Sequence, residues 1–130
     1  MDTQAFYRLI REHGEGLGIE ETKRATAVVF RALRDRLTRE EAEHVAAQLP
    51  AALKEVWTAG ERPGRQPLKL REDEFLERVK HEAGLTSGEA ARRVTMAVFA
   101  VLKAQLSAGE AEDVAAQLPR DLKDLWGTAA

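Results

Sequence analysis

The hexapeptide Val-Ala-Ala-Gln-Leu-Pro occurs twice in this chain, at residues 45–50 and again at residues 114–119. An identical segment that returns 69 positions later indicates a duplicated structural unit. We therefore interpret the chain as two copies of one unit, and this constrains the fold more than any other feature of the sequence. The repeat says nothing about chemistry.

The same offset aligns the large apolar residues of the two halves. Phe6 matches Phe75, Phe30 matches Phe99, and Trp57 matches Trp126. Open solenoids usually need three or more repeats to bury a continuous core, so two copies packed face to face are the simpler arrangement. The sequence predicts a single domain, residues 1–130, made of two internal repeats, 1–59 and 70–130. The connector at residues 60–69 is rich in proline and glycine and is expected to be irregular.

Apolar residues recur at helical spacing in both halves. The stripe is broadest in one long segment of each half: Ala25, Val28, Val29, Ala32 and Leu33, then Val94, Ala97, Val98, Val101 and Leu102. Pro50 and Pro119 end a third helix and begin a short fourth one, because proline disfavours the helical conformation in the residue before it. We expect an all-α fold of about eight helices, in two pseudo-symmetric four-helix units that form one compact domain.

Helix starts are marked by the Ser/Thr-x-x-Glu spacing of a capping box. Three such pairs occur: Thr38 with Glu41, Thr86 with Glu89, and Ser107 with Glu110. In a capping box the hydroxyl and the carboxylate each accept a hydrogen bond from a free backbone N–H group at the helix start. The pairs predict the starts of the third helix in each half and of the second long helix.

Composition and charge exclude several classes of protein. The chain of 130 residues is 44% hydrophobic and 32% charged, which is typical of a soluble globular domain. It has no cysteine, so it has no disulfide or thiolate chemistry. The longest uncharged apolar run, residues 94–102, is far below the about 20 residues of a membrane span. The N-terminus does not resemble a secretory signal, so a cytoplasmic protein is expected. A net charge of −2 lacks the basic field of nucleic-acid-binding proteins.

The order of the motifs resembles a bacterial family, the domain-of-unknown-function family 2267. The matching segments of the second half are Phe75 to Val79, Gly84-Leu85, Gly109-Glu110-Ala111, residues 114–119 and Leu122-Lys123. The first half departs from the pattern at residues 38–41, Thr-Arg-Glu-Glu, where the second half has Ser-Ala-Gly-Glu. The resemblance implies an all-helical, internally duplicated bacterial domain. It implies no activity, ligand, cofactor or catalytic residue.

Two pairs of basic residues lie near the starts of the two long helices. They are Lys23-Arg24 and Arg92-Arg93, which follow Glu20 and Glu89 by three and four residues. This spacing favours local ion pairs on a solvated face. The alternative is a two-fold anion site or partner surface that the pairs share with basic residues of the connector region: Arg62, Arg65, Lys69 and Arg71.

Aromatic, amide and imidazole side chains complete the set of candidates. Trp57 and Trp126 are interpreted as residues that fix the fourth helix to the core, and alternatively as interface aromatics for a partner or a dimer contact. Gln48 and Gln117 precede the prolines and are expected to bridge the backbone of their own turn. The three histidines, His13, His44 and His81, have no metal-ligand spacing, so neither a metal nor a cofactor is predicted.

Three functions follow from these residues, and the sequence ranks them. The first is a non-catalytic helical module that interacts with another protein or with itself, because amphipathic helices repeat without a catalytic motif. The second is nucleic-acid or phosphate-ligand binding through the basic pairs, with a helix-turn-helix between the long and third helices. The acidic net charge counts against it. An enzyme is the least favoured.

Overall fold

The structure is a computed structural model that describes residues 1–14 and 16–129. Within these ranges the chain forms eight α-helices and no β-strand. The helices are α1 (Thr3–His13), α2 (Ile19–Arg36), α3 (Arg39–Ala46), α4 (Ala51–Thr58), α5 (Glu72–Glu82), α6 (Gly88–Gln105), α7 (Ala108–Ala116) and α8 (Arg120–Thr128). The all-helical fold predicted from the sequence is confirmed.

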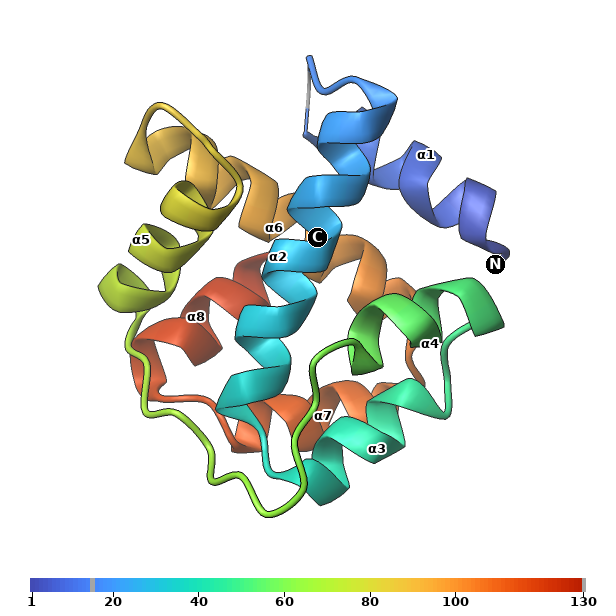
Figure 1. Cartoon of the computed structure of the whole chain (residues 1–130), viewed down its shortest axis with the longest axis vertical. Helices are drawn as coiled ribbons and strands as arrows, with labels where there is room; N and C mark the ends of the chain where they lie inside the picture. Colours follow the sequence, from blue (N-terminus) through green and yellow to red (C-terminus); the bar gives the residue numbers. More distant parts are fainter. Residues whose placement is uncertain (15, 130) are drawn as a thin grey trace.

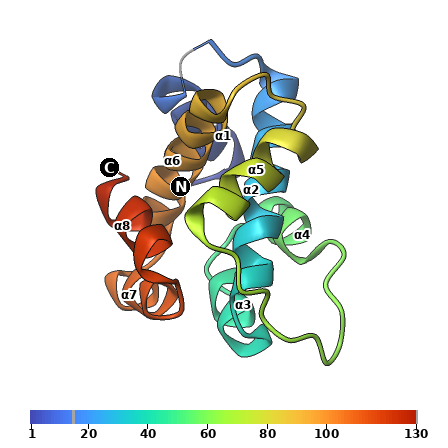
Figure 2. The ribbon, with the colours of Figure 1, turned by 90° about the vertical axis from the view of Figure 1, so that its left-hand side faces the viewer.

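The two long helices, α2 and α6, pack against each other in the middle of the molecule (Figure 1). Helix α1 packs against α2 and also against α6 of the other half, whereas α5 packs against α6 and also against α2. Figure 2 shows this exchange from the side, with α1 beside α6 and α5 beside α2. The apolar stripes of each half are therefore buried partly by the other half, and one continuous hydrophobic core results.

Equivalent aromatic residues fill the two sides of this core. Ring centroids are 5.8 Å apart for Phe6 and Phe30, 5.4 Å for Phe30 and Trp57, 5.8 Å for Phe75 and Phe99, and 5.1 Å for Phe99 and Trp126. Each indole N–H also finds a backbone partner. Trp57 Nε1 donates to the carbonyl of Ala42 at 2.9 Å, and Trp126 Nε1 donates to that of Ala111 at 3.2 Å. Each tryptophan thus ties the fourth helix of its half to the third.

A buried guanidinium holds the segment after α4 against the end of α2. Arg34 is 3% exposed, and its Nη1 donates to the carbonyl of Trp57 at 3.0 Å. It pairs with Asp35 at 3.0 Å and lies 3.8 Å from Glu61, which Arg65 also contacts. Removing water from a charged group is costly unless carboxylates and carbonyls replace the water, and here they do. This network fixes the course of the connector.

The starts of α3 and α7 are capped by hydroxyl groups, as the capping-box spacing predicts. Thr38 Oγ1 accepts from the backbone N–H of Glu41 at 3.1 Å, and Ser107 Oγ accepts from that of Glu110 at 3.2 Å. The second half of the predicted capping box is wrong for both helices. The carboxylates of Glu41 and Glu110 do not return to the N–H groups of the capping residues, because other acceptors already occupy those groups.

These acceptors are glutamine side chains from the opposite half of the chain. The backbone N–H of Thr38 donates to Gln117 Oε1 at 2.9 Å, and that of Ser107 donates to Gln48 Oε1 at 2.7 Å. Each amide also donates from Nε2 to the capping hydroxyl, at 3.3 Å in both cases. The expectation that these amides bridge their own turns is therefore wrong. The duplicated glutamines cap each other's helices across the interface.

The start of α6 lies one residue later than the sequence predicts. Ser87, not Thr86, is the capping residue, and its Oγ accepts from the backbone N–H of Ala90 at 3.1 Å. Either hydroxyl could serve by residue type, since serine and threonine are both favoured at this position. The turn that leaves α5 decides between them. Gly84 adopts a φ of +66°, a left-handed conformation that favours glycine, and this sets where the next helix begins.

The glutamine contacts predict a reciprocal effect on stability. We expect Gln48→Ala and Gln117→Ala each to lower the free energy of unfolding by about 1 kcal/mol, because each substitution leaves a helix-start N–H group without its acceptor. Urea denaturation followed by circular dichroism measures this. Gln66→Ala, at an exposed position of the connector, is the matched control and should change stability by less than about 0.5 kcal/mol. Equal stability of all three variants would contradict the cross-cap.

Candidate functional site

The basic pairs lie on the two long helices, and their contacts come from neighbouring helices. Arg24 Nη2 donates to the carbonyl of Glu82, the last residue of α5, at 3.2 Å. Arg92 forms an ion pair with Glu72, the first residue of α5. Glu89, the partner that helical spacing suggests for Arg92, forms no ion pair with it among the described residues. Part of the positive charge therefore holds α5 in place.

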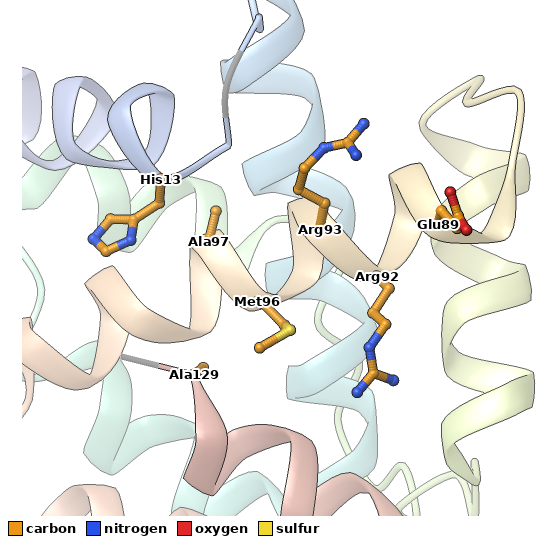
Figure 3. Close-up of a pocket in the computed structure, with 7 residues that line it drawn as sticks. All are labelled: His13, Glu89, Arg92, Arg93, Met96, Ala97 and Ala129. Carbon is orange, nitrogen blue, oxygen red and sulfur yellow. The ribbon is translucent and has the colours of Figure 1, made fainter.

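A groove runs between α1 and α6 and is closed at one end by the residue after α8. We call it the α1–α6 groove; it has a volume of about 380 Å³ and is lined by His13, Glu89, Arg92, Arg93, Met96, Ala97 and Ala129. Figure 3 shows that Met96 and Ala129 lie close together below α6, that His13 approaches from α1, and that Arg92 and Arg93 point to opposite sides of the helix. The groove thus combines an apolar floor with a charged rim.

A second groove lies between α2 and α5 and uses equivalent positions. This α2–α5 groove has a volume of about 460 Å³ and is lined by Arg24, Ala27, Val28, Arg31, Arg78, His81 and Glu82. Arg24, Ala27 and Val28 stand 69 positions before Arg93, Met96 and Ala97 of the first groove. Arg24 of the first basic pair therefore lines one groove, and Arg92 and Arg93 of the second pair line the other. Each groove also contains a histidine from the end of the first helix of one half, His13 from α1 or His81 from α5. The spacing of the histidines in the sequence did not indicate that they lie beside the basic pairs.

The other basic candidates are placed elsewhere. Lys23 Nζ lies 6.0 Å from the centre of the Tyr7 ring, and Lys23 lines neither groove. Arg65 is fixed at the far end of α2, where it donates to the carbonyls of Leu37 at 2.7 Å and Arg34 at 2.9 Å. Arg62 is exposed in the connector. Neither Arg62 nor Arg65 lines either groove.

The two candidate interface aromatics lie inside the molecule. Trp57 is 1% exposed and Trp126 is 3% exposed. Their rings pack on Phe30 and Phe99, respectively, and their N–H groups are satisfied by the backbone. This placement agrees with a role in fixing the fourth helices, and it gives the ends of α4 and α8 no exposed indole.

A pair of buried carboxylates lies where α3 and α7 meet. Glu41 is 9% exposed and Glu110 is 7% exposed, and they occupy equivalent positions of the two halves. The Oε2 atom of each is inaccessible to solvent and has no hydrogen-bond partner among the described groups. His44 Nδ1 lies 3.6 Å from Glu41 Oε2. The sequence indicated these glutamates only as capping residues, since their approach depends on how the halves pack.

The electrostatics of this pair favour a shared proton. Burial raises the pKa of the Glu110 carboxyl to about 8, and the facing Glu41 and the nearby Asp113 add to the increase. Two carboxylates at close range cannot both ionise without strong repulsion. A proton carried by one carboxyl group would be shared with the other, because neither Oε2 atom accepts a hydrogen bond from another described residue.

In the part of the chain that the structure describes, no helix combines the length and the apolar character needed to cross a membrane.

The fold is that of an all-helical protein whose two halves interlock through their first helices and cap each other's third helices. A family described as "Uncharacterized conserved protein (DUF2267)" matches residues 3–125, and the chain belongs to this family. The resemblance recognised in the motifs is confirmed. No curated protein matches the sequence.

The raised pKa of Glu110 predicts that the protein loses stability at alkaline pH. Between the ordinary carboxyl pKa of 4.5 and about 8, the folded protein holds a proton that the unfolded chain releases. The stabilisation is therefore complete below pH 4.5 and is lost as the pH rises through 8. We expect the free energy of unfolding to fall by roughly 2 to 4 kcal/mol between pH 5 and pH 9.

Urea denaturation at a series of pH values, in buffer that contains EDTA, measures this dependence. The variant Glu110→Gln should remove most of the decrease, because the amide keeps the shape of the carboxyl group and does not ionise. Glu112→Gln, at an exposed position of the same helix, is the control and should leave the decrease unchanged. A wild-type protein whose stability is constant from pH 5 to pH 9 would show that no proton is held at this interface.

Proposed function

We propose that this protein is a non-catalytic helical interaction module that binds another protein, or a second copy of itself, at the α1–α6 groove. The observation that carries the proposal is the combination, in one groove, of an apolar floor and a cationic rim. Met96 and Ala129 supply the floor, whereas Arg92 and Arg93 flank it. From the sequence alone, we also propose that the protein acts in the bacterial cytoplasm.

The groove favours a partner segment of mixed chemistry. Protein-binding sites typically surround an apolar centre with polar groups, and arginine is enriched in them. Here an apolar side chain of the partner would enter beside Met96, and an acidic residue of the same segment would meet Arg93 on the opposite side of α6 (Figure 3). The large apolar side chains that are exposed elsewhere, among the residues described, are Met1, Ile19 and Leu68. None of them lines this groove.

Site-specific photo-crosslinking in the native host tests the proposal. A photoreactive phenylalanine at position 96 should give a discrete covalent adduct, whereas the same residue at position 112, an exposed position of α7, should give none. We expect Arg93→Glu to reduce the adduct at least threefold, because it reverses the charge of the rim. Mass spectrometry of the adduct and light scattering of the pure protein separate a second copy from a different partner. The absence of an adduct at position 96 would refute the proposal.

A second candidate function, anion binding, is favoured by the α2–α5 groove. Three arginines and a histidine line it, and Glu82 is its single acidic lining residue. Arg78 is paired with Asp35 at 2.9 Å and with Glu82 at 3.1 Å, so Arg24 and Arg31 would carry most of the attraction for a phosphate group. A helix-turn-helix mode of nucleic-acid binding receives less support, because α3 and α7 present mainly acidic side chains, which repel phosphates.

Anion binding at this groove predicts a salt-sensitive interaction with phosphate compounds. Titration with inorganic triphosphate, followed by NMR or calorimetry at low ionic strength, should give saturable binding that Arg31→Glu weakens at least fivefold. Arg8→Glu, at an exposed position of α1, makes the same change of charge outside the groove and should have little effect. Binding that both variants weaken equally would indicate general electrostatic attraction and not a site. Retention on heparin that survives Arg31→Glu would point to nucleic acid on another surface.

A further inference from the structure

The interface between α3 and α7 brings together three side chains that metal ions favour. Glu41 and His44 come from α3 and Glu110 from α7, and one ligand atom of each lies within 4.8 Å of the other two. Glu41 and His44 are one helical turn apart, but Glu110 is distant in the sequence, so spacing does not indicate the complete site. The packing of the two halves alone assembles the cluster.

The backbone around the cluster is fixed before any ligand binds. Thr38 and Ser107 cap the two helices, and the amides of Gln117 and Gln48 bind the same helix starts from the opposite half. The N–H groups of Thr38 and Ser107 donate to these amide oxygens and not to the carboxylates of Glu41 and Glu110. The two carboxylates are therefore free to face each other. Such preorganisation lowers the cost of binding an ion.

Two buried oxygen atoms of this cluster lack a hydrogen-bond donor among the described residues. Glu41 Oε2 and Glu110 Oε2 are both excluded from solvent and accept no hydrogen bond from any described residue. Buried carboxylate oxygens normally have a donor or a cation beside them, since an unpaired one is costly. The remaining member of the cluster, His44, is 54% exposed, so the site has an open side toward solvent.

We propose that Glu41, His44 and Glu110 form a binding site for a divalent transition-metal ion of the zinc type. The two carboxylates would balance the charge of the ion, and the neutral imidazole supplies the nitrogen ligand that distinguishes such ions from magnesium and calcium. Ligands about 2.1 Å from a shared tetrahedral ion lie about 3.4 Å apart. His44 Nδ1 and Glu41 Oε2 are already 3.6 Å apart, and the ligand atom of Glu110 lies within 4.8 Å of those of the other two residues, so the Glu110 side chain would move toward the ion on binding. Water would complete the coordination on the open side.

The two halves differ at this site in one informative position. Asp113 occupies, in the second half, the position that His44 occupies in the first. The site therefore has a pseudo-two-fold pair of glutamates but a single imidazole. This difference makes His44 the natural residue for testing metal selectivity, because its removal leaves the buried carboxylate pair intact.

Calorimetric titration of the EDTA-treated, full-length protein with Zn²⁺ at pH 7.5 tests the proposal, with Mg²⁺ as the parallel probe. We expect one equivalent of Zn²⁺ to bind and to raise the thermal unfolding midpoint by about 5 °C when the ion is in large excess. Mg²⁺ should bind at least 100-fold more weakly. Co²⁺ should give the visible absorption of a low-symmetry site with nitrogen and oxygen ligands.

Three variants make the result specific to this cluster. Glu110→Gln should weaken Zn²⁺ binding at least 100-fold, and circular dichroism shows whether it remains folded. His44→Gln alters an exposed residue, so it should fold normally and weaken binding at least 10-fold. His13→Gln, at another helix end, is the matched control and should bind Zn²⁺ as the wild type does. The proposal is overturned if Zn²⁺ does not bind, if binding survives Glu110→Gln, or if His13→Gln weakens it as much as His44→Gln.

Discussion

Backbone N–H groups at the start of a helix need acceptors, and in this protein each half supplies an acceptor for the other. The third helix of either half has a hydroxyl cap of its own, but the N–H group of the capping residue is bound by a glutamine from the opposite half. This reciprocal hydrogen bonding aligns α3 with α7 at one end of the molecule, while the exchanged contacts of α1 and α5 align the long helices toward the other (Figure 1). The interlocked core depends on both.

The same contact decides what the interface can do chemically. In an isolated capping box, Glu41 and Glu110 would be used locally at their own helix starts. Because Gln117 and Gln48 take that place, the two carboxylates turn toward each other in a buried position with oxygens that lack partners. A structural hydrogen bond thus creates a pair of groups that can hold a proton or an ion. At an offset of 69 residues, the second half repeats Glu41 as Glu110 but has Asp113 in place of His44. Only the first half therefore offers an imidazole.

Equivalent sequence positions of the two halves line both grooves, but the residues at these positions differ in part. Both grooves lie where the end of a first helix meets the long helix of the other half, and both contain an arginine, a histidine and small apolar residues. Met96 in one groove and Ala27 in the other stand at equivalent positions, as do Arg93 and Arg24. The α1–α6 groove is the more apolar in its lining residues and the α2–α5 groove is the more basic. The two halves therefore present different surfaces on one scaffold, which is the basis for assigning them different candidate partners.

The sequence by itself determined the elements: helical periodicity and proline positions predict eight helices, and the Ser/Thr-x-x-Glu spacing predicts the hydroxyl caps at Thr38 and Ser107. These features are local, because they depend on residues within one or two turns of each other. The order of the motifs along the chain also identified the family. The tertiary structure alone decided the partners of Gln48 and Gln117, whose hydrogen bonds join residues 59 and 79 positions apart. It also decided the burial of Arg34, the approach of Glu41 to Glu110 and the placement of Arg24 and Arg93 in different grooves. Such contacts depend on how whole helices pack. The pattern of residue types within one helix does not specify which distant helix will pack against it.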